Sequence, residues 1–151
     1  MPYEQKDALN TLINGITSAQ KSINISIFSF TNREIAKSLK DAAFRGVKIK
    51  IIYDYETNKA NDSSTIGYLS KYQGIQTCLL QGNEARNQKY YGIMHQKLAI
   101  IDDRIIFLGS ANWSKNAFQN NYELLLKSND QDIITKANHY FEKMFSLCKP
   151  Y

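Results

Sequence analysis

A histidine, a lysine and an aspartate are spaced as H-x-K-x-x-x-x-D over residues 95–102, and a Gly-Ser-Ala-Asn segment follows at 109–112. Successive side chains of a β-strand point to opposite faces, so His95 and Lys97 would share one face and could meet one phosphate. Imidazole can act as a nucleophile and form a covalent intermediate. An ammonium group can neutralise the non-bridging oxygens of a phosphoryl group. The spacing therefore indicates phosphoryl chemistry centred on His95.

These residues resemble the HKD motif of the phospholipase D superfamily, including its trailing G-S-x-N element. Relatives of this length are small bacterial nucleases with one motif in each chain. The resemblance implies a metal-independent phosphodiesterase without a cofactor, which cleaves DNA through a phosphohistidine on His95. Single-stranded DNA as the preferred substrate, and RNA as another, both stay open. The rival enzyme is a phospholipase acting on lipids such as cardiolipin, and a nucleic-acid-binding module with a decayed site is disfavoured by the intact residue set.

Departure of an alkoxide needs a proton donor at neutral pH, and a second histidine suits this role. The chain has only one other histidine, His139, which falls in a helical pattern without a motif around it. Single-motif relatives, as the resemblance implies, place two copies of the motif histidine together, and an isologous interface brings a residue next to its own copy. We therefore expect a homodimer in which the two copies of His95 share one active site.

Four further residues are expected to serve the site. The family pattern implies that Ser110 and Asn112 donate hydrogen bonds to phosphate oxygens, although both could be turn residues only. Glu123 matches the acidic residue that holds the catalytic imidazole in small relatives, with an ordinary strand charge as the alternative. Which subunit's His95 it would hold stays open. Asp102 lies at odd separations from His95 and Lys97, so we expect it to face away from the phosphate. It would anchor its turn through backbone amides or near Lys97, and the alternative is a part in catalysis.

The polar stretch 81–92 lacks clear periodicity and is predicted to be a long loop beside the catalytic strand. Its candidate substrate-binding residues, Arg86, Lys89, Tyr90 and Tyr91, combine cationic and aromatic side chains. This mixture suits a nucleic acid, whose backbone it can follow and whose bases it can stack. The alternative is a solvated loop with its aromatic rings tucked beneath it. Trp113 is a further candidate for base stacking, although we expect it more strongly to pack beneath the site.

Hydrophobic periodicity predicts an α/β fold. Helices are expected at 4–20, 32–44, 62–73 and 130–147, and strands at 23–30, 47–53, 75–80, 97–102, 104–108 and 122–127. The first strand, helix and strand form a βαβ unit with parallel strands, whereas 97–108 indicates an antiparallel hairpin. Together they predict a mixed β-sheet flanked by helices on both faces, the phospholipase D-like fold, in a single domain over 1–151.

Composition limits the class of partner. The net charge of +5 favours an acidic polymer such as nucleic acid or an anionic surface, although this excess is modest. No apolar run approaches the roughly 20 residues of a membrane span, and no signal segment is evident at the start, so membrane association is not evident. Only the family resemblance suggests a location outside the cytoplasm.

Two cysteines, Cys78 and Cys148, lack the C-x-x-C spacing of a metal or redox site. They could form a disulfide in an oxidising compartment, but we favour two partly buried free thiols.

Overall fold

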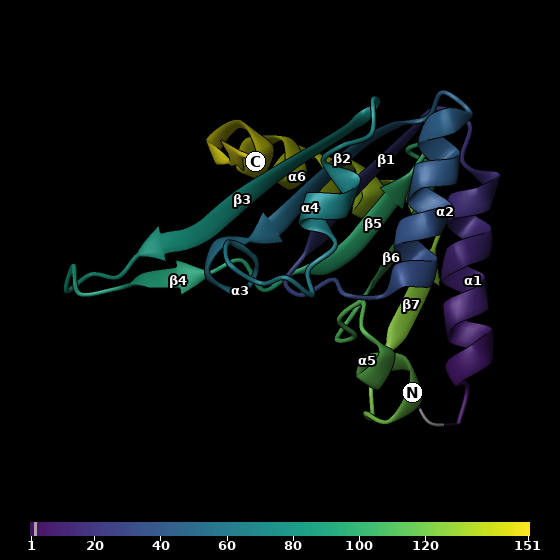
Figure 1. The fold of residues 1–151 in the computed structure, drawn as a ribbon, viewed down its shortest axis with the longest axis horizontal. Helices are drawn as coiled ribbons and strands as arrows, with labels where there is room; N and C mark the ends of the chain where they lie inside the picture. Colours follow the sequence, from purple (N-terminus) through teal and green to yellow (C-terminus); the bar gives the residue numbers. More distant parts are fainter. Residues whose placement is uncertain (2) are drawn as a thin grey trace.

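The fold is built on one mixed β-sheet with helices on both of its faces (Figure 1). The computed structural model describes Met1 and residues 3–151, and among these the sheet has the strand order β4-β3-β2-β1-β5-β6-β7, with β8 added beside β3. The strands are β1 (Ser22–Ile27), β2 (Lys48–Asp54), β3 (Ile75–Glu84), β4 (Tyr91–Ile93), β5 (Lys97–Ile101), β6 (Ile105–Gly109), β7 (Leu125–Ser128) and β8 (Lys149–Pro150). The helices are α1 (Gln5–Ser18), α2 (Arg33–Phe44), α3 (Tyr55–Asn58), α4 (Ile66–Leu69), α5 (Lys115–Gln119) and α6 (Gln131–Leu147).

The pairing of the central strands follows from their connections. The β1–β2 and β2–β3 pairs are parallel, because α2 and the α3–α4 segment carry the chain back across the sheet. The β1–β5, β5–β6 and β6–β7 pairs are antiparallel. One end of the central strands therefore carries the C-terminal ends of β1 and β2 together with the N-terminal end of β5. His95 and Lys97 lie where the chain enters β5 at this end. The predicted mixed α/β fold is confirmed.

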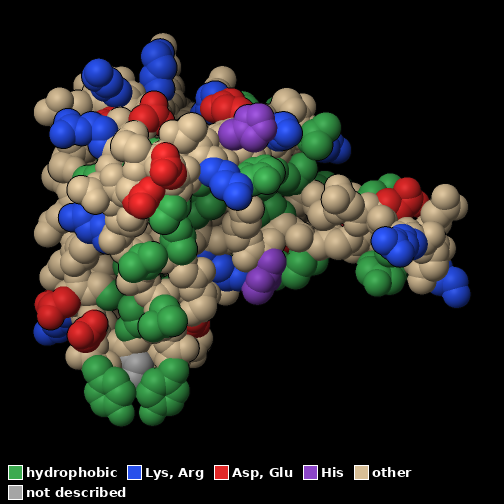
Figure 2. All heavy atoms as spheres, turned by 180° about the vertical axis from the view of Figure 1, so that it is seen from behind, with side chains coloured by type: hydrophobic (Ala, Val, Ile, Leu, Met, Phe, Trp, Pro, Cys, Tyr) green, Lys and Arg blue, Asp and Glu red, His purple; other side chains and the backbone are tan. Residues whose placement is uncertain are grey.

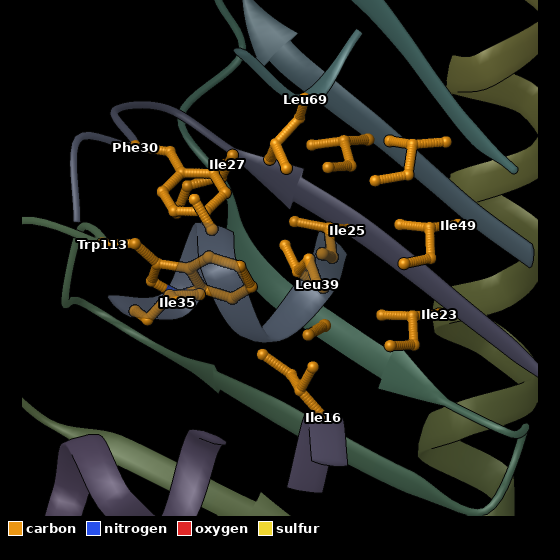
Figure 3. Packing of buried hydrophobic residues seen from close by; sticks show 14 of the residues in the cluster. Ile16, Ile23, Ile25, Ile27, Phe30, Ile35, Leu39, Ile49, Leu69 and Trp113 are labelled. Carbon is orange, nitrogen blue, oxygen red and sulfur yellow. The ribbon is translucent and has the colours of Figure 1, made fainter. Parts of the chain in front are cut away.

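The main core lies between the sheet and the helices α1 and α2. Alternate residues of β1, namely Ile23, Ile25 and Ile27, point into this layer and pack against side chains of both helices (Figure 3). Residues of the other parity face α6, where Ile52 of β2 packs with Phe141 in a separate cluster. Since each buried side chain of this size contributes on the order of 1.5–3 kcal/mol, alternation along the central strands fixes their register.

Trp113 belongs to this core rather than to a binding surface. Its side chain is 1% exposed and packs at the edge of the Phe30 ring, with 5.0 Å between the ring centroids (Figure 3). An indole so enclosed presents no face to a base. Its interpretation as a base-stacking residue was therefore wrong, and the packing alternative holds.

The segment 81–92 is a β-hairpin arm, not the predicted irregular loop. Strand β3 continues to Glu84, turns, and returns as β4, and the arm projects from the body of the molecule (Figures 1 and 2). At its base the strands approach so closely that a Cβ on Gly82 would lie 2.4 Å from the backbone of Gly92. Both faces of the arm are largely solvated, so apolar and polar residues do not alternate along it. The sequence therefore shows no strand pattern there.

Three other predicted boundaries were also wrong. The strand expected to reach residue 30 ends at Ile27. The helix expected at 62–73 is reduced to the single turn of α4, and the strand expected from residue 122 begins at Leu125. The short helices α3 and α5 were missed, because one helical turn is too short to show a period of 3.6 residues.

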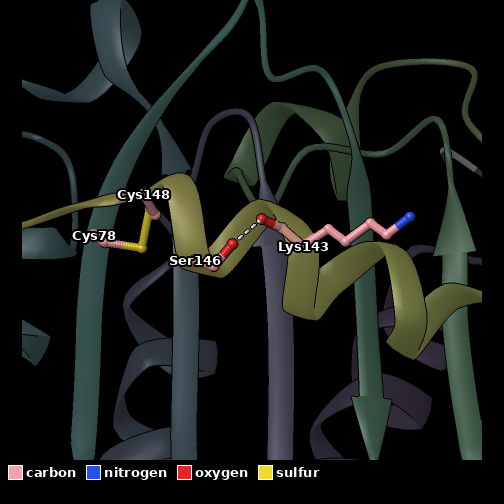
Figure 4. The surroundings of a disulfide bond; sticks show 4 residues. All are labelled: Cys78, Lys143, Ser146 and Cys148. Atoms are coloured by element: carbon pink, nitrogen blue, oxygen red, sulfur yellow. Dashed lines mark hydrogen bonds between the residues drawn. A yellow bond between two sulfur atoms is a disulfide. The ribbon is translucent and has the colours of Figure 1, made fainter.

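Cys78 and Cys148 form a disulfide (Figure 4). The expectation of two free thiols was therefore wrong. The residues after α6 form β8, which pairs antiparallel with β3 and brings Cys148 beside Cys78 across 70 positions of sequence. Sequence spacing gave no sign of this strand pairing.

Candidate active site

His95 is an exposed side chain on a tightly held backbone. The preceding residue, Met94, is buried, and its N–H donates to the carboxylate of Asp54 at 2.9 Å. On the other side, the carbonyl of Gln96 accepts from the N–H of Phe28 at 3.0 Å, and its side chain accepts from the Ser26 hydroxyl at 2.8 Å. The imidazole can therefore reach a substrate while its backbone stays fixed between β1 and β2.

Lys97 is the buried cation of the site. Its side chain is 8% exposed, and its Nζ donates to the carbonyl of His95 at 2.8 Å. Burial lowers the pKa of the Lys97 ammonium, and the negative charge of Glu123 opposes that shift. A Lys97 ammonium has three donors, so two stay available for phosphate oxygens.

Ser110 and Glu123 are hydrogen-bonded to each other, and the charge of Glu123 acts on Lys97. The Ser110 hydroxyl donates to the Glu123 carboxylate and accepts from the N–H of Leu124 at 3.0 Å. Gly109 is required here, because a Cβ at that position would lie 2.0 Å from the carbonyl oxygen of Leu124. The Gly-Ser pair of the motif thus serves close packing of β6 against the segment that leads into β7.

Within the described part of the chain, the Glu123 carboxylate bonds Ser110 and, at 3.4 Å, the amide of Asn121. The sequence left open which copy of His95 Glu123 would hold, and no bond from Glu123 to the imidazole of the same chain is observed among these residues. Such a bond would require either an imidazole from another copy of the chain or a rearrangement within this one.

Asn112 lies in the loop between β6 and α5, between the buried residues Ala111 and Trp113. Its Oδ1 atom is buried and has no hydrogen-bond partner among the described residues. Unsatisfied buried polar atoms are uncommon in folded proteins and cost free energy, so each needs a reason. Because Oδ1 only accepts, a ligand that donates a hydrogen bond would supply such a reason, whereas a phosphate oxygen would not.

Asp102 lies at the far end of β5 from His95. Its carboxylate accepts backbone N–H groups of Gln20, Lys21 and Ser22 at 2.9, 2.7 and 3.0 Å. Partial burial disfavours the charged form, but the three N–H groups together outweigh it and lower the pKa of Asp102. This carboxylate therefore fastens the turn after β5 to the chain that enters β1.

The four candidate substrate-binding residues lie on the arm. Tyr90 is 64% exposed and Tyr91 53% exposed, so the alternative of tucked aromatic rings does not hold. Arg86 and Lys89 are also exposed, near the turn of the hairpin. Because β4 leads through Met94 into His95, the arm is joined directly to the motif segment.

His139 is remote from this site. It is exposed on α6, where its ring contacts Tyr140. The two histidines of the chain are well separated on the molecular surface (Figure 2). Among the described residues, no three His, Cys, Asp or Glu side chains gather as a metal site would require, and none of the helices is long and apolar enough to cross a membrane.

This geometry can be set beside known proteins. The family described as "Cardiolipin synthase, PLD-like domain" matches residues 12–145. The chain belongs to the phospholipase D-like family. Its mixed sheet with helices on both faces is the fold of a solved phospholipase D family member, Nuc from Salmonella typhimurium.

Two solved structures and one curated relative illustrate the likeness of this phospholipase D-like chain. NucT from Helicobacter pylori is 60% identical with a TM-score of 0.98, covering 100% of this chain and 95% of that chain. Nuc from Salmonella typhimurium, a phospholipase D family member, is 26% identical with a TM-score of 0.79, covering 95% of this chain and 90% of that chain. The human mitochondrial cardiolipin hydrolase is 28% identical over 145 residues, which are 96% of this chain and 54% of that protein. The chain thus spans about half the length of this curated relative.

Several residues that hold the motif segment of this phospholipase D-like chain were not predicted from the sequence. Asp54, Ser26 and Phe28 lie on or just after the parallel strands β1 and β2 and hold the motif segment in place. The βαβ pattern could have suggested the region, because ligands of such sheets lie at the C-terminal ends of parallel strands. No residue type marked these three positions individually.

Proposed function

We propose that this chain is a metal-independent nuclease that hydrolyses DNA, single-stranded DNA above all, through a phosphohistidine on His95. The observation that carries this proposal is the exposed imidazole on a rigid backbone beside the buried cation Lys97. The likeness to the small Nuc-type structures over the whole chain supports a nuclease over other phosphodiesterases.

In the proposed reaction, a neutral imidazole nitrogen of His95 attacks phosphorus, and the bond from phosphorus to the leaving oxygen breaks. The imidazolium of a second His95 gives its proton to that oxygen. Water then attacks the phosphohistidine and gives a proton to the second imidazole, which restores both histidines. Lys97 offsets the charge of the non-bridging oxygens, so this role requires no metal ion.

The hydrogen bonds divide the remaining roles. The Ser110 hydroxyl has one proton and already donates it to Glu123, so Ser110 would hold this carboxylate rather than the phosphate. Asn112 is then the better candidate for the donor to a phosphate oxygen, through its Nδ2 and not through the buried Oδ1. Glu123 would orient an imidazole and stabilise its charged form.

We propose that the second His95 comes from a second copy of the chain. The exposed apolar side chains next to Glu123 support this: Tyr122 is 82% exposed and Leu124 is 78% exposed. They border a hollow of about 730 Å³ beside α1 that is also lined by Ser110 and Glu123. Strand β7 is the last strand of the sheet among the described residues, so its outer edge pairs with no further strand there and could receive one from another chain. A two-fold contact here would cover apolar surface and bring two sites together.

The arm is proposed to hold the substrate strand. Arg86 and Lys89 would contact phosphates, and Tyr90 and Tyr91 would stack on bases, as in other grooves for single-stranded nucleic acid. We also propose a location outside the cytoplasm, which the Cys78–Cys148 disulfide supports because such bonds persist in oxidising compartments.

A panel of substrates tests the proposed function. Purified protein is incubated with labelled single-stranded DNA, duplex DNA, RNA and cardiolipin vesicles, each with and without millimolar EDTA, and His95→Ala serves as the control. We expect rapid cleavage of single-stranded DNA that is unchanged by EDTA and absent in the control. Loss of cleavage on chelation, with rescue by magnesium, would contradict the mechanism.

The second candidate is a phospholipase, which the named cardiolipin hydrolase relative favours. It predicts release of phosphatidic acid from cardiolipin vesicles by wild type and not by His95→Ala. Lipid cleavage without DNA cleavage would replace the first proposal by this one.

A further inference from the structure

The backbone of Phe28 is fixed by hydrogen bonds on both sides. Its N–H donates to the carbonyl of Gln96 at 3.0 Å, and its own carbonyl accepts from the amide of Asn58 at 2.8 Å. Asn58 is buried and in turn accepts from the Ser64 hydroxyl at 2.7 Å. Phe28 therefore occupies a defined position at the end of β1, although its side chain is half-buried rather than part of the main core.

The ring of Phe28 contacts both reactive groups of the motif. Its centroid lies 4.7 Å from that of the His95 ring, at an interplanar angle of 62°. It also lies 5.2 Å from Nζ of Lys97. Edge-to-face contacts favour one ring orientation, and the negative face of an aromatic ring attracts a cation. One side chain thus touches the proposed nucleophile and the proposed phosphate-binding cation.

We propose that Phe28 is a positioning residue for the reaction, which orients the imidazole of His95 and keeps Lys97 charged and directed at the phosphate. This inference rests on the roles proposed above for His95 and Lys97. Phe28 itself does not exchange protons or bonds with the substrate.

An aromatic ring suits Lys97 better than a carboxylate would. Among the ion pairs of the described residues none includes Lys97, so its burial is not offset by a direct salt bridge. A carboxylate in contact would neutralise the ammonium and compete with the substrate phosphate. The quadrupole of the ring stabilises the cation and leaves its net charge available.

The competing explanation is that Phe28 only fills space beside the motif. In that case an aliphatic side chain of similar volume would serve as well, since packing depends on volume rather than on the electrons of a ring. Phe28→Leu keeps an apolar group but removes the ring, whereas Phe28→Tyr keeps the ring. Phe44→Leu is a matched control, because Phe44 is an exposed aromatic residue at the end of α2.

The test measures kcat and KM of these variants on a short single-stranded oligonucleotide, with thermal melting to verify folding. For Phe28→Leu we expect kcat to fall about tenfold to a hundredfold with KM within about twofold, since the contacts serve the reacting groups and not the bound strand. Phe28→Tyr should stay within about threefold of wild type, and Phe44→Leu should be unchanged. A folded Phe28→Leu with full kcat, or Phe28→Tyr as slow as Phe28→Leu, overturns the proposal.

A second readout follows the charge of Lys97 by NMR of labelled lysine side chains during a pH titration. The groups that face Lys97 are the ring of Phe28, His95 and Glu123, so Glu123→Gln is titrated in parallel. Phe28→Leu should lower the pKa of Lys97 by about half a unit to one unit, while Phe28→Tyr should leave it unchanged. An unshifted pKa in Phe28→Leu contradicts the proposal even where activity is lost. If wild type and His95→Ala cleave at equal rates, the proposed function fails, whatever the result at Phe28.

Discussion

His95 is held through its backbone neighbours, whereas Lys97, Ser110 and Glu123 are held by hydrogen bonds of their own side chains. The imidazole of His95 is exposed, yet Met94 before it is bonded to the carboxylate of Asp54, and Gln96 after it is bonded to β1. Such an arrangement keeps the proposed nucleophile accessible while its main chain is held by hydrogen bonds. It also explains why the residue types of the motif could be recognised from sequence whereas Asp54, which has no chemical role in the motif, could not.

Substitution of the two motif residues should stop the reaction without unfolding the protein. We expect His95→Ala and Lys97→Met each to lower the cleavage rate on the order of a thousandfold or more, about 4 kcal/mol of transition-state stabilisation. His139→Ala, on the exposed surface of α6, is the control and should be nearly silent. Steady-state kinetics with melting curves provide the measurement. A folded His139→Ala as slow as His95→Ala would show that His139, and not a second His95, supplies the second imidazole.

Asp102 should act on stability rather than on catalysis. Asp102→Asn removes the charge from three hydrogen bonds with backbone N–H groups, so we expect a loss of about 1–3 kcal/mol in the free energy of unfolding. Because the pKa of Asp102 is lowered by folding, its contribution is present above the ordinary aspartate pKa and is lost as pH falls through the folded value. Denaturation with urea at neutral and at strongly acidic pH measures this, with the exposed Asp62→Asn as control. A difference from wild type that is the same at both pH values would refute the electrostatic explanation.

At the scale of elements, the sequence predicted those helices and strands that bury side chains at a regular spacing. Alternation gave β1, β2, β3, β5 and β6, and helical spacing gave α1, α2 and α6, because these elements bury one face against the sheet. The arm and the short helices were not predicted, since they bury too little to leave a period in the sequence. The candidate site was predicted to the extent that it lies in the motif, while its framing residues depend on strand pairing over long distances.

The arm should contribute charge to substrate binding. Arg86→Ala and Lys89→Ala are each expected to weaken binding of single-stranded DNA across sequences. Each should flatten the slope of log affinity against log salt. The change should be somewhat smaller than the loss of one full phosphate contact, which is worth about 0.7 to 0.9 in slope. Fluorescence anisotropy at several salt concentrations measures the slope, and Lys136→Ala on α6 is the exposed control. Unchanged slopes in both arm variants would return the arm to an ordinary solvated surface.

The disulfide should stabilise the attachment of the C-terminal segment. It closes a loop across 70 positions, so reduction is expected to lower the free energy of unfolding by about 2–4 kcal/mol. Melting with and without a reductant measures this, and a variant with both Cys78→Ser and Cys148→Ser should show no response to the reductant. Equal stability of oxidised and reduced wild type would show that β8 and α6 hold this segment without the bond.

At the scale of the whole molecule, one chain supplies only one of the two imidazoles that the proposed reaction needs at the site. One imidazole lies at the site, the other histidine is remote on α6, and exposed apolar side chains surround Glu123. A two-fold dimer reconciles these observations, because it supplies the second imidazole and covers the apolar surface at once.

Subunit mixing tests this central claim most directly. Wild type is mixed with an equal amount of His95→Ala under conditions in which size-tagged chains are first shown to exchange. Random pairing leaves about a quarter of all dimers fully wild type, and the number of dimers has doubled, so a shared site predicts that the activity of the original wild-type protein falls to about half. Undiminished activity after proven exchange would mean that each chain works alone, and would contradict the shared site.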